Sequence, residues 1–388
     1  MPAASGGPGP TVAVIGGGQL ARMMAEPAAA LGIPLRLLAE APGVSAAQVI
    51  ADHEVGDYRD LTTLRLVTDG CAVVTFDHEH VPTEHLHALA TDGIAVRPGP
   101  DALVHAQDKA VMRSALGRLG VPCPRNLVVE TPEEVGAFGF PCVLKTTRGG
   151  YDGKGVWFVT SEDDAKEAFA RAGAAGVDVL AEELVDFTRE LSALVARSPS
   201  GQVAAWPVVA SEQRDGICRE VVAPAPGLDP DLAVEAQQIA MRIAAELEVV
   251  GVLAVELFET SDGRVLVNEL AMRPHNTGHW TQDGSVTSQF ENHLRAVLDL
   301  PLGDPAARAP WTVMVNILGG DGRGRLYDGY PHALARDPRV RVHLYGKELR
   351  PGRKVGHVNA YGDDLEDCLE RARHAAAWFA GELGDESQ

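Results

Sequence analysis

The sequence predicts an α/β domain at the N-terminus, followed by an α+β region that is built largely from hairpins. Three observations support this prediction: strand and helix patterns alternate over roughly the first hundred residues, paired strands dominate from residue 140, and a Pro/Ala-rich link near residue 301 precedes a last strand and helix. With 388 residues, of which 45% are hydrophobic and 23% charged, the chain has enough apolar material for two or three packed domains.

The N-terminal elements begin with a short apolar strand and a glycine turn. Residues 11–15 predict the strand, residues 16–18 the turn, and residues 19–32 a helix that Gly32 ends. The alternation predicts a doubly wound α/β domain, which ends where RPGP at 97–100 breaks the pattern. The other elements expected here are strands at 35–40, 71–76 and 94–96 and helices at 61–67, 84–90 and 108–120.

Strand pairs dominate the middle of the chain. Two helices are predicted to begin at Thr131 and Ser161, because each is followed three residues later by an acidic residue that completes a capping box. A longer helix, from Asp231 to Val249, has one apolar face. The predicted strands are 141–147, 156–160, 179–185, 190–196 and 202–209, and the apolar face comprises Leu232, Ala236, Ile239, Ile243 and Leu247.

Charge and targeting signals exclude several classes of function. The 34 basic and 54 acidic side chains give a net charge of −20, which disfavours nucleic acid and anionic membrane surfaces as partners. No apolar run reaches the roughly eighteen residues that a membrane helix needs, and residues 1–21 lack the basic residues of a secretory signal. We therefore expect a cytoplasmic protein whose five widely spaced cysteines are reduced.

The hairpin around the Asp-Gly pair at 262–263 carries the strongest chemical signal. A two-residue turn at this pair would place Ser261 opposite Arg264 and Glu256 directly opposite Glu269. Two like charges so placed destabilise a hairpin unless a divalent cation binds between them. The sequence therefore predicts Glu256 and Glu269 as Mg²⁺ ligands, and a solvated hairpin face with two unrelated glutamates is the less favoured alternative.

Other candidate metal ligands are weaker. In the predicted register Asn268 points to the opposite face of the hairpin, which makes Asn276 the better candidate for a further polar ligand. The segment DHEHVPTEHLH (77–87) holds four histidines, but Pro82 interrupts the spacing that would bring them to one face. A metal site at these histidines is therefore not favoured.

A glycine-rich loop, KTTRGGYDGKG at 145–155, lies between two predicted strands. Its four glycines let backbone amides approach an anion, while Arg148 and Lys154 supply positive charge. The loop is not a Walker A motif, because no Ser or Thr follows Lys154 and a strand follows in place of a helix. We interpret it as a phosphate cover. A flexible hairpin loop is the alternative, but a strand lysine such as Lys145 needs a partner.

A second glycine motif follows the first strand. Gly16, Gly18 and Ala21 satisfy the dinucleotide pattern GxGxxG/A, and Glu40 ends the next strand. This pattern leaves an NAD-dependent oxidoreductase as an alternative. Because tight strand-to-helix turns use the same glycines for many phosphate ligands, Gln19 could equally contact a mononucleotide.

Together these segments resemble the ATP-grasp enzymes, and among them the N5-carboxyaminoimidazole ribonucleotide synthetases of purine biosynthesis. The matching stretches are GGGQLARM, TTRGGYDGKG, NELAMRPHNTGHWTQDGSVTSQFENHLRA and KELRPGRKVGH, spread from residue 11 to about residue 361. The resemblance implies an ATP-grasp fold with an N-terminal Rossmann-like (preATP-grasp) domain and a small C-terminal β-rich domain, commonly in a homodimer. The implied boundaries are a flexible tail over 1–10, then domains over 11–107, 108–300 and 301–388.

The resemblance also implies a set of ligand contacts. ATP and Mg²⁺ are the implied ligands of the central domain, with the metal at Glu256 and Glu269. The implied ATP contacts are Lys109, Lys145, Gly150, Tyr151, Asp152, Gly153, Lys154, Gly155, Val156, Glu182, Glu183, Leu184, Val185, Glu190, Gln213, Asn268 and Glu269. The implied contacts of aminoimidazole ribonucleotide are Gly18, Gln19, Leu20, Glu79, Tyr151, Arg273, His275, Asn276, Lys347, Arg353 and Lys354, and the catalytic candidates are Asp152, Arg273, His275 and Lys347.

The implied reaction joins bicarbonate to aminoimidazole ribonucleotide at the cost of ATP, through carboxyphosphate. Lys109 stands where the family commonly has arginine, Gln213 where it has histidine, and Asp77 with His78 where it has glutamate and an apolar residue. Two further alternatives are a formate-using ribonucleotide transformylase of the same group and a non-catalytic nucleotide sensor of ATP-grasp shape.

Overall fold

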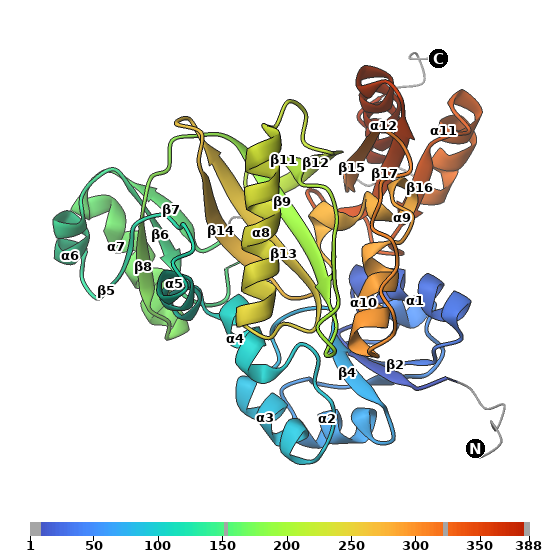
Figure 1. The fold of residues 1–388 in the computed structure, drawn as a ribbon, viewed down its shortest axis with the longest axis horizontal. Helices are drawn as coiled ribbons and strands as arrows, with labels where there is room; N and C mark the ends of the chain where they lie inside the picture. Colours follow the sequence, from blue (N-terminus) through green and yellow to red (C-terminus); the bar gives the residue numbers. More distant parts are fainter. Residues whose placement is uncertain (1–8, 151–153, 321–324, 384–388) are drawn as a thin grey trace.

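The computed structural model describes residues 9–150, 154–320 and 325–383 (Figure 1). The described chain forms a parallel sheet at the N-terminus, a small antiparallel sheet that projects to one side, and a large antiparallel sheet that runs through the centre (Figure 1). Of the tail expected over residues 1–10, all but the last two positions lie outside the described residues. The implied domain boundaries remain predictions.

The N-terminal sheet has the doubly wound pattern that the alternation predicted. Its strands are parallel in the order β3-β2-β1-β4, and β1 is fully buried between β2 and β4. The strand expected at 94–96 is only a single parallel bridge between Val74 and Val96, and polar β3 was not predicted. The elements are β1 (Val12–Ile15), α1 (Gln19–Leu31), β2 (Leu35–Ala39), η1 (Ala46–Gln48), β3 (His53–Val55), α2 (Leu61–Thr68), β4 (Val73–Phe76), α3 (Thr83–Thr91) and α4 (Pro100–Gln107).

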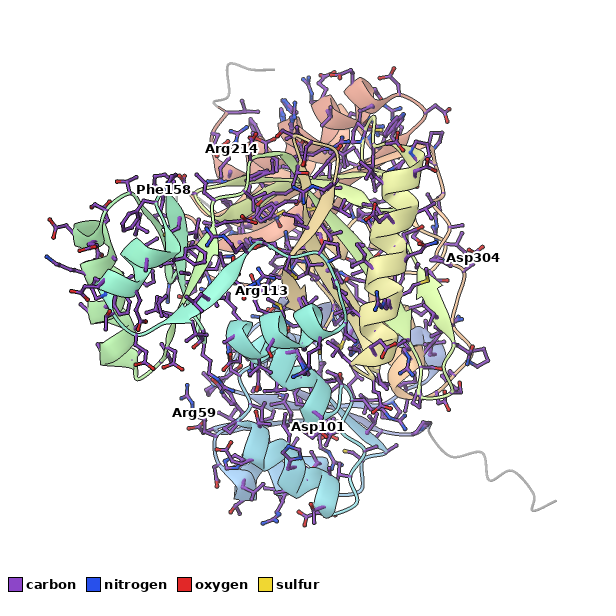
Figure 2. All side chains as sticks on the ribbon, turned by 60° about the vertical axis from the view of Figure 1, so that its left-hand side comes forward. Arg59, Asp101, Arg113, Phe158, Arg214 and Asp304 are labelled. Carbon is purple, nitrogen blue, oxygen red and sulfur yellow. The ribbon has the colours of Figure 1, made fainter. Side chains whose placement is uncertain are left out.

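The small sheet has the order β5-β8-β6-β7 and packs helices against one face. Thr131 and Ser161 each accept a hydrogen bond from a backbone N–H three residues later, at 3.3 Å, so both predicted helix starts are confirmed. On the other face, Phe158 of β7 is 59% exposed (Figure 2). The elements are α5 (Lys109–Arg118), β5 (Asn126–Val129), α6 (Pro132–Phe138), β6 (Cys142–Thr146), β7 (Val156–Val159), α7 (Glu162–Ala175) and β8 (Val179–Glu183).

The large sheet is continuous across the predicted start of the C-terminal domain. Its order is β14-β13-β9-β11-β12-β15-β17-β16, with β10 paired to β9, so the C-terminal strands extend the central sheet through the β12–β15 pair. Its strands are β9 (Phe187–Arg197), β10 (Val203–Ala205), β11 (Val209–Arg214), β12 (Ile217–Ala223), β13 (Gly251–Thr260), β14 (Val265–Ala271), β15 (Trp311–Leu318), β16 (Arg341–Leu344) and β17 (Lys354–Gly362).

Helices cover this sheet, and α8 packs on it with the apolar face that the sequence predicted. Ala236, Ile239 and Ile243 are buried there, whereas Leu232 and Leu247 at the two ends are partly buried. The helical elements are α8 (Pro230–Glu246), η2 (Asn276–Gly278), α9 (Thr281–Gly284), α10 (Gln289–Val297), η3 (Leu326–Gly329), α11 (Tyr330–Arg336) and α12 (Leu365–Ala380). No helix in the described residues is both long and apolar enough to span a bilayer.

Candidate active site

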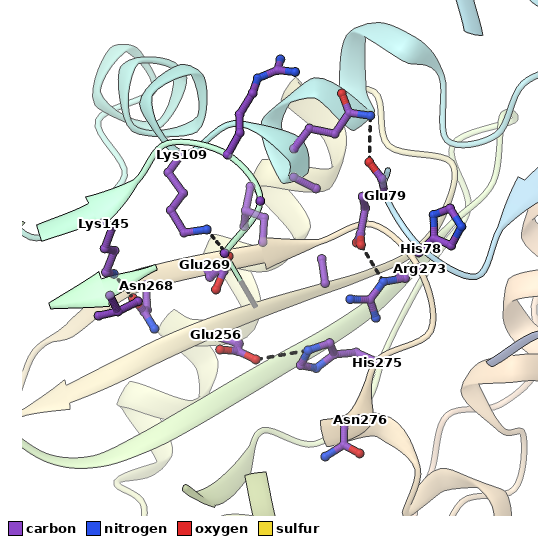
Figure 3. A pocket seen from close by; sticks show the side chains of 18 of the residues that line it. His78, Glu79, Lys109, Lys145, Glu256, Asn268, Glu269, Arg273, His275 and Asn276 are labelled. Carbon is purple, nitrogen blue, oxygen red and sulfur yellow. Dashed lines mark hydrogen bonds and ion pairs between the residues drawn. The ribbon is translucent and has the colours of Figure 1, made fainter. Parts of the chain in front are cut away.

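A large cavity lies where the three sheets meet. It has a volume of ≈1040 Å³, and strands β6 and β7, the β13–β14 hairpin and the segment that follows β4 all contribute side chains to its wall (Figure 3). Figure 2 shows Arg113 of α5 at the junction between the small-sheet part and the rest of the molecule. The cavity therefore lies between parts of the chain whose relative positions cannot be predicted from the sequence.

The β13–β14 hairpin opposes Glu256 and Glu269, as the sequence predicted. The predicted turn is wrong, however, because the Thr260 N–H bonds the Arg264 carbonyl at 2.9 Å, which leaves three residues in the loop. A register shift between Glu256 and Leu257 then adds one residue to β14 and restores the carboxylate pair. A two-residue loop without a bulge and a three-residue loop with one bulge thus lead to the same opposed glutamates.

The bulge also overturns the predicted direction of Asn268. This residue is the extra one on β14, and its Oδ1 accepts a hydrogen bond from the Lys145 ammonium at 3.0 Å in the cavity wall (Figure 3). Arg113 holds the bulge from outside the sheet, by donating to the carbonyl oxygens of Val267 at 2.9 Å and Asn268 at 2.8 Å. The expectation that Asn268 faces away was wrong because it assumed an unbroken register.

Arg113 was not predicted as a site residue, although a signal was present in the sequence. It lies four residues after Lys109, beside the apolar Met112 and Leu116 of α5, and a charge within an apolar helix face needs a buried partner. The partner is Glu182, whose carboxylate contacts the Arg113 Nε at 2.6 Å and the Lys145 Nζ at 2.7 Å.

Two neighbouring cations keep the buried carboxylate of Glu182 ionised. Burial opposes ionisation of Glu182, but the two cations outweigh it and lower the pKa of the carboxyl below its ordinary value. Lys145 is thereby held in place, with its ammonium in the cavity wall. Lys109 lies on the other side, 2.9 Å from Glu269.

The carboxylate pair has the properties of a cation site. Burial and the nearby carboxylates of Glu269 and Glu190 raise the pKa of Glu256 to about 8. Such repulsion is relieved when a divalent cation takes the place of the proton, and the oxygen donors of Glu256, Glu269 and Asn268 are those that Mg²⁺ prefers. The donor set therefore fits Mg²⁺.

Arg273 and His275 extend the site beyond this pair. The guanidinium of Arg273 contacts Glu79 at 2.7 Å, and His275 Nε2 lies 3.2 Å from Glu256 Oε1 (Figure 3). Burial, together with the cations of Arg273 and Lys354, holds the pKa of His275 well below its ordinary value, so the ring is neutral. Asn276 follows it at the cavity wall, and both of its amide atoms are buried with no hydrogen-bond partner among the residues that the structure describes.

The glycine turn after β1 is filled by the protein itself. Asp77 accepts the Ala21 N–H at 2.8 Å, Glu40 accepts the Gly17 N–H at 2.9 Å, and a Cβ at Gly18 would come within 2.1 Å of Asp77. Two backbone amides of this turn are therefore occupied by carboxylates, and Glu40 is engaged within the turn. This geometry argues against the NAD-dependent alternative.

The structure brings most of the expected contacts to one cavity. Of the described contacts, Gly18, Lys154, Gly155, Lys347 and Arg353 are not part of the cavity wall, although Lys347 reaches it by a hydrogen bond to Gln19. Tyr151, Asp152 and Gly153 lie outside the described residues. Those in the wall are Gln19, Leu20, Glu79, Lys109, Lys145, Gly150, Val156, Glu182, Glu183, Leu184, Val185, Glu190, Gln213, Glu256, Asn268, Glu269, Arg273, His275, Asn276 and Lys354.

Arg148 and the histidines of 77–87 were weaker signals in the sequence. Arg148 of the glycine loop pairs with Asp108 at 2.9 Å, next to the start of α5, and it too lies at the cavity. Within the described ranges no group of three or more His, Cys, Asp or Glu side chains is arranged to hold a metal, and this includes the histidines of 77–87. All five cysteines are free.

Comparison with known families defines the class of protein. Residues 114–290 match the ATP-grasp domain, residues 10–107 the ribonucleotide synthetase preATP-grasp domain, and residues 312–371 the phosphoribosylaminoimidazole carboxylase C-terminal domain. The fold is therefore an ATP-grasp fold with a preATP-grasp N-terminal domain.

Relatives and solved structures narrow this class. The N5-carboxyaminoimidazole ribonucleotide synthase of Mycobacterium bovis is 55% identical over 377 residues, covering 96% of this chain and 88% of the relative. That of Corynebacterium ammoniagenes is 53% identical, covering 95% of this chain and 91% of the relative. The Aspergillus clavatus N5-carboxyaminoimidazole synthase, crystallised with ADP and 5-aminoimidazole ribonucleotide, is 30% identical with a TM-score of 0.86, covering 95% of this chain and 98% of that one.

The chain belongs to the N5-carboxyaminoimidazole ribonucleotide synthase family. It is an ATP-grasp ligase, and its reaction is an ATP-dependent carboxylation in purine biosynthesis.

Proposed function

We propose that the chain uses ATP, Mg²⁺ and bicarbonate to convert 5-aminoimidazole ribonucleotide into its N5-carboxy derivative. The observation that carries this proposal is the opposed pair Glu256 and Glu269 in the wall of a cavity that also holds Lys145 and Arg273. The A. clavatus relative, which is 30% identical to this chain, was crystallised with ADP and the ribonucleotide. Both ligands therefore fit a site of this family.

The ATP phosphates are proposed to lie between the small sheet and the hairpin. Lys145 and Lys109 are fixed there by Glu182 and Glu269, so their charges are oriented before nucleotide binds. Glu256 and Glu269 would hold Mg²⁺, with Asn268 beside them. When bound, the metal supplies positive charge to the β- and γ-phosphate oxygens.

The first chemical step is attack of a bicarbonate oxygen on the γ-phosphorus. This bond forms as the bond to the ADP oxygen breaks, giving carboxyphosphate and ADP. Lys145 and Arg273 would neutralise the charge on the transferring oxygens, and Arg273 is held in position by Glu79. Catalysis in this step is positioning and charge stabilisation, which preorganised cations provide.

The second step transfers the carboxyl group to the exocyclic amine of the ribonucleotide. Carboxyphosphate releases phosphate and CO₂ in the cavity, the amine nitrogen attacks the carbon, and the nitrogen loses one proton. Asp152 is proposed as the acceptor of that proton, on the strength of the family resemblance. Lys354 in the cavity wall, together with Lys347 and Arg353, would bind the ribonucleotide phosphate.

One assay tests the substrate set. Phosphate release should require ATP, bicarbonate and the ribonucleotide together, and omitting the ribonucleotide should reduce it strongly. Full turnover with formate in place of bicarbonate would contradict the proposal in favour of a transformylase. Phosphate release that is independent of the ribonucleotide would also contradict it.

We also propose a homodimer and a cytoplasmic location. The dimer is inferred from the family resemblance, and the location from a purine-biosynthetic role. Sedimentation of the purified chain at micromolar concentration, with an expected mass of twice 41.1 kDa, tests the dimer.

A further inference from the structure

Two buried hydroxyl groups hold the His275 ring on the side away from Glu256. Thr277 Oγ1 lies 2.9 Å from His275 Nδ1, and Ser192 Oγ lies 2.7 Å from Thr277 Oγ1. Ser192 is 1% exposed and Thr277 2% exposed, and neither belongs to the cavity wall. Neither hydroxyl is therefore placed to touch a ligand in the cavity.

The direction of the hydrogen bonds follows from one backbone group. The Thr277 N–H, which can only donate, also approaches His275 Nδ1, at 3.4 Å, in the first turn of η2. Nδ1 is therefore an acceptor, and the proton of the neutral ring is on Nε2. The Thr277 hydroxyl then donates to Nδ1 and accepts from the hydroxyl of Ser192.

This tautomer turns an N–H group toward the carboxylate pair. His275 Nε2 lies 3.2 Å from Glu256 Oε1, so the ring donates to the oxygen of a carboxylate proposed to bind Mg²⁺. In the other tautomer a lone pair would face the oxygen of the ionised carboxylate, the form that binds a cation, and this is unfavourable. The orientation of Glu256 thus depends on the hydroxyl of Thr277, two hydrogen bonds away, and on that of Ser192, three hydrogen bonds away.

We propose that Thr277 and Ser192 are positioning residues that hold His275 in the Nε2–H tautomer and thereby orient Glu256 for a divalent cation. The inference rests on the proposed function, since it assumes that Glu256 is a metal ligand. Loss of a group that orients a metal ligand typically reduces metal affinity about 10–100-fold. The hydroxyls should therefore affect cation binding more than nucleotide binding.

Binding of Mn²⁺ to the full chain in the presence of ADP, followed by electron paramagnetic resonance, tests this directly. Thr277→Val keeps the shape of the side chain but removes the hydroxyl, and we expect Mn²⁺ affinity to fall about tenfold or more. Thr277→Ser should keep affinity within about twofold of the unmodified chain, and Ser192→Ala should give a smaller loss than Thr277→Val. Binding of ADP in EDTA should be unchanged in all three.

Two outcomes would overturn the inference. One is unchanged Mn²⁺ affinity in Thr277→Val. The other is an equal loss of metal-free ADP binding or a lowered melting temperature in both Thr277→Val and Thr277→Ser, which indicates a merely structural role. If the proposed function itself is wrong, the unmodified chain will bind no Mn²⁺ in the presence of ADP, which distinguishes this result from a failure of the inference.

Discussion

Arg113 donates a hydrogen bond to the carbonyl oxygen of Asn268 at 2.8 Å, from a helix that lies 155 residues away in the chain. The same guanidinium contacts Glu182, and Glu182 in turn fixes Lys145. One buried side chain therefore sets both the bulge that aims Asn268 into the cavity and the position of Lys145 in the cavity wall. Arg113 connects the helix before the small sheet to the edge of the large one.

Arg113→Met should destabilise the protein by about 3–5 kcal/mol, because it leaves Glu182 buried with one partner fewer. Urea unfolding followed by circular dichroism measures this change. Arg118→Met is the matched control, since Arg118 is exposed on the same helix and its replacement should stay within about 0.5 kcal/mol. Equal stability of the two variants would show that the buried contacts of Arg113 do not stabilise the fold.

Cation binding should depend on pH through Glu256. Its folded-state pKa is raised to about 8, so the carboxyl is protonated at neutral pH and a divalent cation must displace the proton. Apparent Mn²⁺ affinity should therefore rise roughly tenfold per pH unit up to about pH 7.5 and level off above the pKa. Glu256→Gln should weaken binding and remove most of this dependence. An affinity that is constant from about pH 6 to about pH 8.5 in the unmodified chain would contradict the raised pKa.

Asp152→Asn should separate nucleotide binding from carboxylation. If Asp152 accepts the amine proton, the amide keeps the size of the side chain but loses the base, and kcat should fall about 100-fold or more. Binding of ADP, measured by calorimetry, should stay within about twofold of the unmodified chain. Normal turnover in the variant would remove Asp152 from the mechanism.

Lys354→Ala should raise KM for the ribonucleotide about tenfold or more, because it removes a charge-assisted hydrogen bond to phosphate. KM for ATP should change little. Lys166→Ala, on the exposed face of α7, serves as the control and should leave both values as they were. An unchanged KM for the ribonucleotide in Lys354→Ala would place its phosphate elsewhere.

Much of the fold followed from local pattern. The strand–glycine–helix alternation of the N-terminal domain, the capped helices at Thr131 and Ser161 and the apolar face of α8 were predicted, because each depends on residues close together in sequence. The strand β3, which was missed, has a largely polar sequence and is a strand because it pairs with β2.

The prediction of the candidate site was only partly correct. The opposed carboxylates were expected from the hairpin, yet the loop was one residue longer than predicted and a bulge compensated. Asn268 was assigned to the wrong face for the same reason. Nothing local to β14 predicts the bulge, whereas Arg113 stabilises it from another part of the chain.

The sequence by itself determined the order of the main elements and the opposed carboxylate pair. It also indicated which basic residues could bind an anion in a protein of negative net charge. Only the tertiary structure decided which face Asn268 presents, how Lys145 is held and how the hydroxyls of Ser192 and Thr277 orient His275. Local patterns repeat with the period of a helix or strand. These contacts instead join residues far apart in the chain, and their geometry exists only once the sheets have packed together.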